Sequence, residues 1–359
     1  METSHQPTSR GLPRPIRGLL VNQASAHKQS DTLLSIAVLS TTLVLGACSS
    51  DADDKAENTS SGANSAANSG DNASEVNIKH ARGEDTYPVN PERVVAIGPA
   101  IDNLLAMGIK PSAVVVSAKD MNAPWRDGKL DGVEIIKQTD FKTLPKEEIA
   151  AAAPDFIVGD YWTISEDNYA QLSEIAPTLG GIGTEGEGIG WKSQLKELGK
   201  IFNKEDKAQE VIDQDEKVFS DAKSELSNIE GKTGVVSQFA QGSFGAVADP
   251  KDPGASFIYD LGMKFPESLT DGSIEVKQGR VTLSPENVSA LAADFMVIYN
   301  RTGDIAEVEK IPGYSDLPQV KSGATLAGNE AVVAGLNTPT ALSRAWVLEQ
   351  VKPTLKKIS

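Results

Sequence analysis

From about residue 93 onward, short apolar runs alternate with segments whose apolar residues recur at helical spacing. Residues 93–97 are largely apolar and predict a strand, which a Gly-Pro pair ends. Residues 100–107 have the spacing of a helix, Gly108 suits its C-terminal end, and residues 112–116 return to strand. This order predicts a β–α–β unit and therefore a parallel sheet.

The same alternation continues to the end of the chain, which predicts an α/β fold. A loop and a helix should follow the strand that begins at Phe156. Further strands are expected over residues 156–158, 233–239 and 294–299, and further helices over residues 191–202, 254–261 and 340–351.

One predicted helix is unusually long. Residues 205–229 contain neither glycine nor proline, and their apolar positions recur near helical spacing. They predict a helix of roughly 25 residues, which is long for a globular protein. Such a helix could lie on the surface of one domain, or it could join two lobes.

A partial internal repeat relates the two halves of the chain. Residues 146–158, KEEIAAAAPDFIV, align without gaps with residues 285–297, PENVSALAADFMV. Each segment is expected to be a short helix that begins near a proline and leads into a buried strand. Two β/α lobes joined by one long helix would leave a cleft between them, and ligands commonly bind in such clefts.

The N-terminal region has the pattern of a secretion signal. Residues 32–47, TLLSIAVLSTTLVLGA, are apolar and uncharged, and basic residues precede them. The run is shorter than the ~20 residues of a membrane span but fits the core of a signal peptide. Its end, LGAC, resembles the bacterial lipobox, so we expect residues 1–47 to be removed and Cys48 to carry diacylglycerol. Alternatively, Cys48 is buried at the end of a membrane-anchoring helix.

Residues 48–75 are rich in Ser, Ala, Asn, Asp and Gly and contain few apolar side chains. Such a composition cannot offset the entropy lost on ordering by burying apolar surface. The segment therefore predicts a disordered tether between the lipid-bearing cysteine and a folded body that begins near residue 76.

Charge and composition exclude several classes of function. The formal net charge is −16, and it is −18 once the net +2 of residues 1–47 is removed. This argues against a nucleic-acid partner, whose phosphates require a basic surface. Because Cys48 is the single cysteine, no intramolecular disulfide can form. His80 is the single histidine after it, so a typical zinc site or Cys–His catalytic pair cannot be built.

Several segments together resemble one protein family. They are the lipobox, NPERVVAIGPAIDNLLAMGIKP, EEIAAAAPDFIVGDYW, YAQLSEIAPT, WKSQLKELGKIFNKEDKAQEVI and SPENVSALAADFMVIYNR. Over about residues 77–358 the chain is similar to the helical-backbone class of substrate-binding proteins of ABC importers, in the group for ferric siderophores, haem and cobalamin. The segments KHARGEDTYPVNPERVVAIG and NTPTALSRAWVLEQ are most similar to iron–siderophore binders of actinobacteria.

The resemblance implies two Rossmann-like β/α lobes, residues 76–203 and 231–359, a single connecting helix within residues 204–230, and a ligand cleft between the lobes. It implies a protein that is not an enzyme and has no cofactor. Its ligand would be an iron(III)–siderophore complex, which it would deliver to an ABC permease at the outer face of the cytoplasmic membrane of a Gram-positive-type cell. We expect a monomer with no nucleic-acid partner.

By the same resemblance, Glu147 and Glu286 are the glutamates, one on each lobe, that meet arginines of the permease. Opposed charges on such a surface orient the partners and speed their association. Glu148 is the alternative residue on the first lobe. Both positions are also consistent with ordinary first-turn carboxylates that the helix macrodipole stabilises.

Candidate ligand-binding residues lie where strands end, because open α/β sheets bind ligands there. Aromatic rings offer rigid contact area to an organic ligand, and arginines match anionic oxygens. The residues are Trp125, Arg126, Tyr161, Trp162, Trp191, Phe239, Arg301 and Arg344. The resemblance supports Arg301 in particular, since binders of ferric catecholates place an arginine at this strand end. The alternatives are core packing for each tryptophan and a surface salt bridge for Arg301.

The chemical class of the ligand is open. Catecholate binders carry further arginines where this chain has Tyr161, Trp162 and Ser243, which favours a less charged ligand, such as a hydroxamate or mixed siderophore. Haem or a corrinoid is the alternative on the same scaffold, with Tyr161, Tyr169 or Tyr299 as the haem ligand. Bare ferric iron is a further alternative. A carboxylate hydrolase is another, although the chain has no G-x-S-x-G motif.

Overall fold

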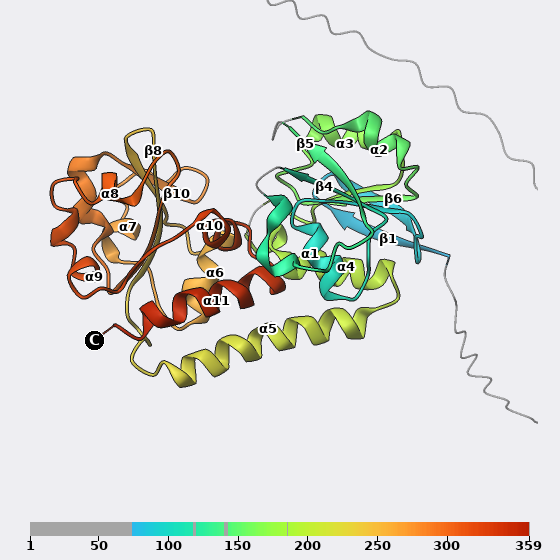
Figure 1. The fold of residues 1–359 in the computed structure, drawn as a ribbon. Coiled ribbons are helices and arrows are strands. Elements are labelled where there is room, and N and C mark those ends of the chain that lie inside the picture. The colour runs from blue at the N-terminus through green and yellow to red at the C-terminus, as the bar shows by residue number, and fades with distance from the viewer. Residues whose placement is uncertain (1–73, 118–119, 140–142, 185, 359) are drawn as a thin grey trace, which may run out of the picture. The chain divides into compact units, whose positions relative to one another are not determined.

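The computed structural model describes residues 74–117, 120–139, 143–184 and 186–358 (Figure 1). They belong to one unit of the chain, Ser69–Ser359. The predicted signal peptide, Cys48 and the predicted tether up to residue 73 lie outside the described residues. Strand β1 begins at Glu75, the last residue assigned to the tether.

The N-terminal lobe is built on a five-stranded sheet in the order β5-β4-β3-β6-β7, in which all neighbouring strands are parallel. The predicted β–α–β unit is confirmed, because α1 (Ala100–Ala106) connects β3 to β4. The strands are β3 (Val94–Ile97), β4 (Ala113–Ser117), β5 (Glu134–Gln138), β6 (Phe156–Gly159) and β7 (Thr178–Gly180). The central strands β3 and β6 are buried throughout, as expected for apolar strands of a parallel sheet.

The C-terminal lobe has a five-stranded sheet in the order β10-β9-β8-β11-β12. Its strands are β8 (Gly234–Ala240), β9 (Ser243–Val247), β10 (Arg280–Leu283), β11 (Phe295–Asn300) and β12 (Thr325–Ala327). Strands β8, β11 and β12 are parallel, whereas β9 runs antiparallel to β8 and β10. The two-lobed α/β fold is thus confirmed, with one antiparallel strand that sequence reasoning missed.

Strand β9, which the sequence analysis did not predict, follows a tight two-residue turn after β8. Gln241 and Gly242 both have positive φ, 51° and 76°, as a two-residue type I′ turn requires. Phe239 lies inside β8, as predicted, and Phe244 lies inside the unpredicted β9.

The long helix α5 (Glu205–Glu225) connects the two lobes (Figure 1). It is 21 residues long and ends four residues before the predicted end, because Leu226 leaves helical geometry at φ −106° and ψ 55°. Its first half contributes Val211 and Ile212 to a core shared with β3 and β6 of the N-terminal lobe. Its second half contributes Phe219 and Ala222 to a core of the C-terminal lobe.

A second long helix, α11 (Ala341–Leu355), runs alongside α5 (Figure 1). Thr340 caps it, and the hydroxyl of Ser343 accepts a hydrogen bond from the Thr340 backbone N–H in return. The Thr340 hydroxyl also donates to Asp102 in α1, at 3.0 Å. This cap therefore joins the C-terminal helix to the N-terminal lobe.

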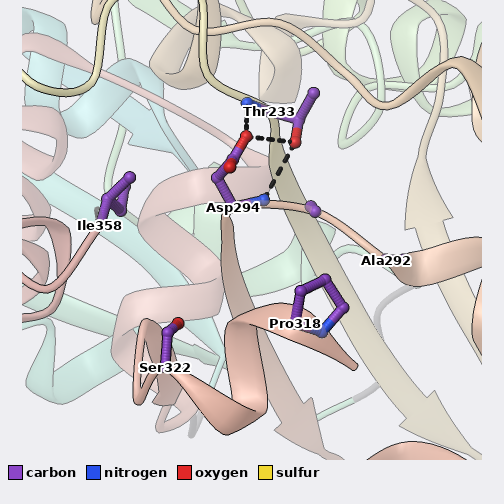
Figure 2. Close-up of a pocket in the computed structure, with 7 residues that line it drawn as sticks. Thr233, Ala292, Asp294, Pro318, Ser322 and Ile358 are labelled. Atoms are coloured by element: carbon purple, nitrogen blue, oxygen red, sulfur yellow. Dashed lines mark hydrogen bonds between the residues drawn. The ribbon is translucent and has the colours of Figure 1, made fainter. Parts of the chain in front are cut away.

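The internal repeat has a structural basis in its aspartates. Asp155 accepts hydrogen bonds from the backbone N–H groups of Glu92 and Arg93, just before β3. Asp294 does the same for Thr233, just before β8, and accepts from its hydroxyl as well (Figure 2). In each lobe, the repeated aspartate fixes the start of one central strand against its neighbour.

Two predicted helices differ from the structure. The first repeat segment forms the α-helix α2 (Lys146–Ala151). The second forms 3₁₀ turns, η5 (Pro285–Leu291), with a kink at Asn287, whose φ −97° and ψ 18° are not helical. The helix predicted over residues 254–261 is divided into η4 (Pro253–Ala255) and α6 (Ser256–Asp260).

The remaining elements surround the two sheets or form the β1–β2 hairpin. They are β1 (Glu75–His80), β2 (Gly83–Pro88), η1 (Asp120–Asn122), η2 (Pro124–Arg126), α3 (Glu166–Ser173), η3 (Gly186–Ile189), α4 (Trp191–Ile201), α7 (Glu267–Thr270), α8 (Ile305–Val308), η6 (Tyr314–Asp316), α9 (Pro318–Lys321) and α10 (Glu330–Asn337). Within the described ranges, no helix is both long and apolar enough to span a membrane.

Candidate functional site

A cleft of ≈ 1020 Å³ is lined by residues of both lobes and of α5. From the N-terminal lobe and α5 come Trp162, Thr184, Ile189, Gly190, Trp191, Lys192, Ser193, Lys196 and Glu216. From the C-terminal lobe come Asp249, Pro250, Lys251, Asp252, Pro253, Ser256, Tyr259, Asp260, Gln278, Gly279, Pro339 and Arg344. Its volume is at the upper end of the range of about 300–1,000 Å³ for small-molecule sites.

Aromatic rings from both lobes line this cleft. Trp162 follows the carboxyl end of β6 and is 49% exposed, while its ring packs edge-on against Tyr161 at 5.3 Å. Tyr259 in α6 is 37% exposed and is backed by the ring of Phe265 at 5.2 Å. Trp191, the first residue of α4, is mostly buried. The cleft thus offers two exposed rings, each supported by a second ring.

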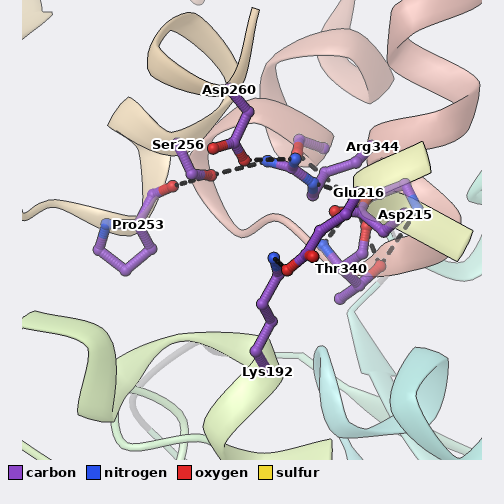
Figure 3. Close-up of polar contacts among 10 residues, drawn as sticks. Lys192, Asp215, Glu216, Pro253, Ser256, Asp260, Thr340 and Arg344 are labelled. Carbon is purple, nitrogen blue, oxygen red and sulfur yellow. Dashed lines mark hydrogen bonds and ion pairs between the residues drawn. The ribbon is translucent and has the colours of Figure 1, made fainter. Parts of the chain in front are cut away.

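Arg344 borders the cleft and makes a network of polar contacts (Figure 3). Its Nε donates to Asp215 Oδ1 at 2.8 Å, Nη1 to the Ser256 hydroxyl at 2.9 Å, and Nη2 to Asp260 Oδ2 at 2.7 Å. The guanidinium also stacks on the ring of Phe219, 3.9 Å from its centroid. Arg344 is 1% exposed, and its hydrogen bonds join α11 to α5 and α6.

The carboxylate of Asp215 is buried together with Arg344. Burial raises the pKa of Asp215 above its usual value, and the charge of Arg344 opposes that rise. One oxygen of the Asp215 carboxylate, Oδ2, is buried without a hydrogen-bond partner among the described residues. The ion pair with Arg344 is therefore the main interaction that compensates the buried charge of Asp215.

Another ion pair in the same region connects α4 to α5 (Figure 3). Lys192 Nζ in α4 lies 2.8 Å from Glu216 Oε1 in α5. The Lys192 ammonium also lies 5.7 Å from the centroid of the Trp191 ring. Within the C-terminal lobe, Asp252 lies 3.7 Å from Arg280. Burial raises the pKa of the Asp252 carboxyl.

Three of the eight predicted ligand-binding residues line the cleft, namely Trp162, Trp191 and Arg344. Trp125 and Arg126 lie instead against Asp102, which is 2% exposed. Trp125 Nε1 donates to Asp102 at 2.8 Å, and its ring contacts Trp346 of α11 at 5.6 Å. These two residues are therefore part of the contact between α1, η2 and α11.

The other predicted residues lie elsewhere. Tyr161 has the guanidinium of Arg82 over its ring, at 4.7 Å. Phe239 packs against Phe244 at 4.9 Å, and Arg301 is exposed just after β11. Phe239 and Arg301 sit at the carboxyl ends of β8 and β11, whereas the cleft is bordered by the residues that follow β9 and precede β10, next to the amino end of β8. Their role in ligand binding stays a prediction.

Of the three tyrosines considered as haem ligands, Tyr169 has another partner near His80. His80 is buried and lies 3.0 Å from Asp85, and the Tyr169 hydroxyl donates to the same carboxylate. Burial raises the pKa of Tyr169 to about 12. Tyr161 and Tyr299 are not among the residues that line the cleft.

Sequence reasoning missed Tyr259 and the lysines Lys192, Lys196 and Lys251 in the cleft wall. None of them follows the carboxyl end of a parallel strand, which was the rule used to choose candidates. Burial raises the pKa of Tyr259 above its usual value. Among the residues that the structure describes, no three His, Cys, Asp or Glu side chains are placed to hold a metal ion.

The two glutamates predicted to dock on a permease are both exposed. Glu147 lies in the first turn of α2, and Glu286 in the first turn of η5. A hydrogen bond with the side chain of Ser284 lowers the pKa of Glu286, which favours its charged form. Glu148 is equally exposed, so burial does not distinguish it from Glu147.

A second, smaller pocket of ≈ 310 Å³ belongs to the C-terminal lobe alone (Figure 2). Thr233, Asp294 and Pro318 are among the residues that line it. It lies at the amino ends of β8 and β11, and Asp294 already accepts two hydrogen bonds there. The larger cleft is lined by residues of both lobes and by exposed aromatic rings, so it is the better candidate.

Comparisons with known proteins identify similar binding proteins. Residues 94–327 match the family of periplasmic binding proteins. The chain is 33% identical over 235 residues to YfiY of Bacillus subtilis, described as a probable siderophore-binding lipoprotein, covering 64% of this chain and 70% of YfiY. It is 26% identical over 252 residues to FhuD of the same organism, an iron(3+)-hydroxamate-binding protein, covering 68% and 76%. It is also similar to PiaA of Streptococcus pneumoniae TIGR4 in complex with ferrichrome, with a TM-score of 0.65 and 26% identity over 79% of this chain and 99% of that one.

Proposed function

We propose that this chain, which belongs to the periplasmic binding protein family, captures a ferric siderophore outside the cytoplasmic membrane and delivers it to an ABC importer. The observation that carries the proposal is the ≈ 1020 Å³ cleft between two β/α lobes, with exposed aromatic rings on both of its sides. The siderophore-binding relatives support the choice of ligand. The proposed role is binding and release without chemical turnover.

The cleft fits a siderophore better than haem. Tyr259 is the single tyrosine among the described residues that line it, and no histidine is among them, so the cleft offers haem iron one phenol as an axial ligand. The two exposed rings, Trp162 and Tyr259, suit the organic scaffold of an iron complex that already carries its own oxygen ligands.

Fluorescence titration tests the proposal. The full chain, purified in detergent, would be titrated with a ferric hydroxamate, a ferric catecholate, ferric citrate, haem, cobalamin and free ferric iron. A ferric complex close to Trp162 and Trp191 should quench their emission saturably, and the complex should be recovered unchanged. Saturable binding of haem or cobalamin alone would move the function to the alternative ligand. If none of these compounds changes the fluorescence, the cleft is not the ligand-binding site.

The proposed permease contact is through Glu147 and Glu286, one on each lobe. Substituting both by alanine should reduce cellular uptake of the ferric complex and leave its affinity for the purified protein unchanged, because neither residue lines the cleft. Glu148→Ala is the matched control on α2. An equal loss of uptake in the control would assign the contact to α2 in general rather than to Glu147.

The proposed location is the outer face of the cytoplasmic membrane, through a lipid on Cys48. A Cys48→Ala variant should be recovered in the medium rather than in the membrane fraction, because no acyl chains would hold it. If the variant stays in the membrane fraction, the apolar segment 32–47 is itself the anchor.

A further inference from the structure

We propose that the cleft selects ferric complexes by charge, accepting those with little or no net charge and disfavouring strongly anionic ones. This inference rests on the proposed function, because it concerns the ligand of the same cleft. The charged side chains that line the cleft are equal in number for the two signs. The cations are Lys192, Lys196, Lys251 and Arg344, and the acids are Glu216, Asp249, Asp252 and Asp260.

Two of the four cations, Arg344 and Lys192, are already compensated inside the protein. Arg344 is buried, and its nitrogens donate to two carboxylates, Asp215 and Asp260, so it has little charge to offer a ligand. Lys192 is paired with Glu216 at 2.8 Å. Lys196 and Lys251 form no ion pair among the described residues, but Asp249 also lines the cleft without a cationic partner there.

Ferric complexes of the two main ligand types differ in net charge. Three singly charged hydroxamates cancel the charge of Fe(III), whereas three doubly charged catecholates leave three negative charges in excess. A trianionic complex needs a net surplus of cations to replace the water it loses on binding, and the charges that line this cleft sum to zero. An uncharged complex needs chiefly contact area, which Trp162 and Tyr259 supply from opposite lobes.

A pair of matched variants on one helix tests the proposal. Glu216→Gln removes the partner of Lys192 and so adds one uncompensated positive charge to the cleft. Glu210→Gln makes the same change elsewhere on α5. Glu210 pairs with Lys207 at 2.9 Å, its side chain is 62% exposed against 60% for Glu216, and it does not line the cleft.

The measurement is the ratio of dissociation constants for an uncharged cyclic ferric tris-hydroxamate and a trianionic tripodal ferric tris-catecholate. The unaltered protein should bind the hydroxamate at least tenfold more tightly. One extra unit charge about 8 Å from a trianion should narrow that ratio by about tenfold at low ionic strength in Glu216→Gln, and by only a few-fold at about 0.15 M salt. Glu210→Gln should leave the ratio unchanged.

Two results would overturn the inference and leave the proposed function intact. One is tighter or equal binding of the catecholate by the unaltered protein. The other is an equal shift of the ratio in Glu216→Gln and Glu210→Gln, which would mean that the charge acts from a distance rather than within the cleft. Binding of neither ferric complex would instead reject the proposed function, and the inference with it.

Discussion

Replacing Arg344 by methionine should destabilise the fold strongly, although the residue borders a solvent-accessible cleft. The side chain is 1% exposed, and its three nitrogens donate to Asp215, Ser256 and Asp260. Methionine approximates the length of the stem but provides no donor. Arg344→Met therefore removes the hydrogen bonds and leaves the apolar packing in place.

The magnitude follows from what the substitution leaves behind. The Asp215 side chain is 1% exposed, so it would remain as a buried carboxylate without a counter-charge, which costs about 3–5 kcal/mol. Asp260 is 42% exposed and can recover its hydration, so it should add little. For a folded body of about 285 residues, this loss corresponds to a decrease in melting temperature of about 5–8 °C.

The loss should depend on pH, with a sign set by Asp215. Burial raises the pKa of this carboxyl, and loss of Arg344 removes the charge that opposes the rise. The folded variant should therefore bind a proton in a pH range where the unfolded chain does not, and its stability should fall as pH rises through that range. The gap between the variant and the original protein should narrow as pH falls toward the ordinary pKa of an aspartate.

Chemical denaturation followed by circular dichroism, over a range of pH, would measure these changes. Arg301→Met is the matched control, because Arg301 is exposed and should change stability by no more than about 0.5 kcal/mol. Adding Asp215→Leu to Arg344→Met should recover most of the loss, since no buried charge then remains. A loss below about 1 kcal/mol, or no recovery in the double variant, would refute the assignment of Arg344–Asp215 as a stabilising buried pair.

Substitutions at Thr340, Trp162 and Trp191 probe the cap and the cleft. Thr340→Val removes both the helix cap and the hydrogen bond to Asp102, so it should lower the free energy of unfolding by about 1–2 kcal/mol in chemical denaturation. Thr340→Ser keeps the hydroxyl and should leave the free energy of unfolding nearly unchanged. The same free energy of unfolding in both variants would show that the hydroxyl contributes nothing. Trp162→Ala should weaken binding of a ferric complex by about tenfold or more with little change in stability, because the ring is exposed. Trp191→Ala should instead destabilise the fold by about 3–5 kcal/mol, because the residue is 8% exposed. Unchanged ferric-complex affinity in Trp162→Ala would place the ligand away from this ring.

Local patterns in the sequence were sufficient for the framework of the fold. Apolar runs and helical spacing predicted the first β–α–β unit, the start of α5 and both strands that end the internal repeat, because these features depend on neighbours along the chain. They were less reliable where backbone geometry changes at a single residue. Examples are the hairpin at Gln241 and the early end of α5 at Leu226.

The site depended on contacts that no local pattern contains. Arg344 is separated from Asp215 by 129 positions and from Asp260 by 84, yet its guanidinium contacts both carboxylates beside the cleft. Trp125 resembled a ligand-binding tryptophan in the sequence, but its indole donates to Asp102 beneath α11. Tyr259 was overlooked because only the tertiary structure turns α6 toward the opposite lobe.

Periodicity and an internal repeat are properties of neighbouring residues, and they were enough to indicate two β/α lobes and one long helix. The tertiary structure decided which charges remain available to a ligand. Burial and pairing set the availability of a charge, and both depend on residues brought together from distant parts of the chain. Lys192 and Arg344 are positive in any reading of the sequence, but Glu216, Asp215 and Asp260 compensate them only in the folded protein.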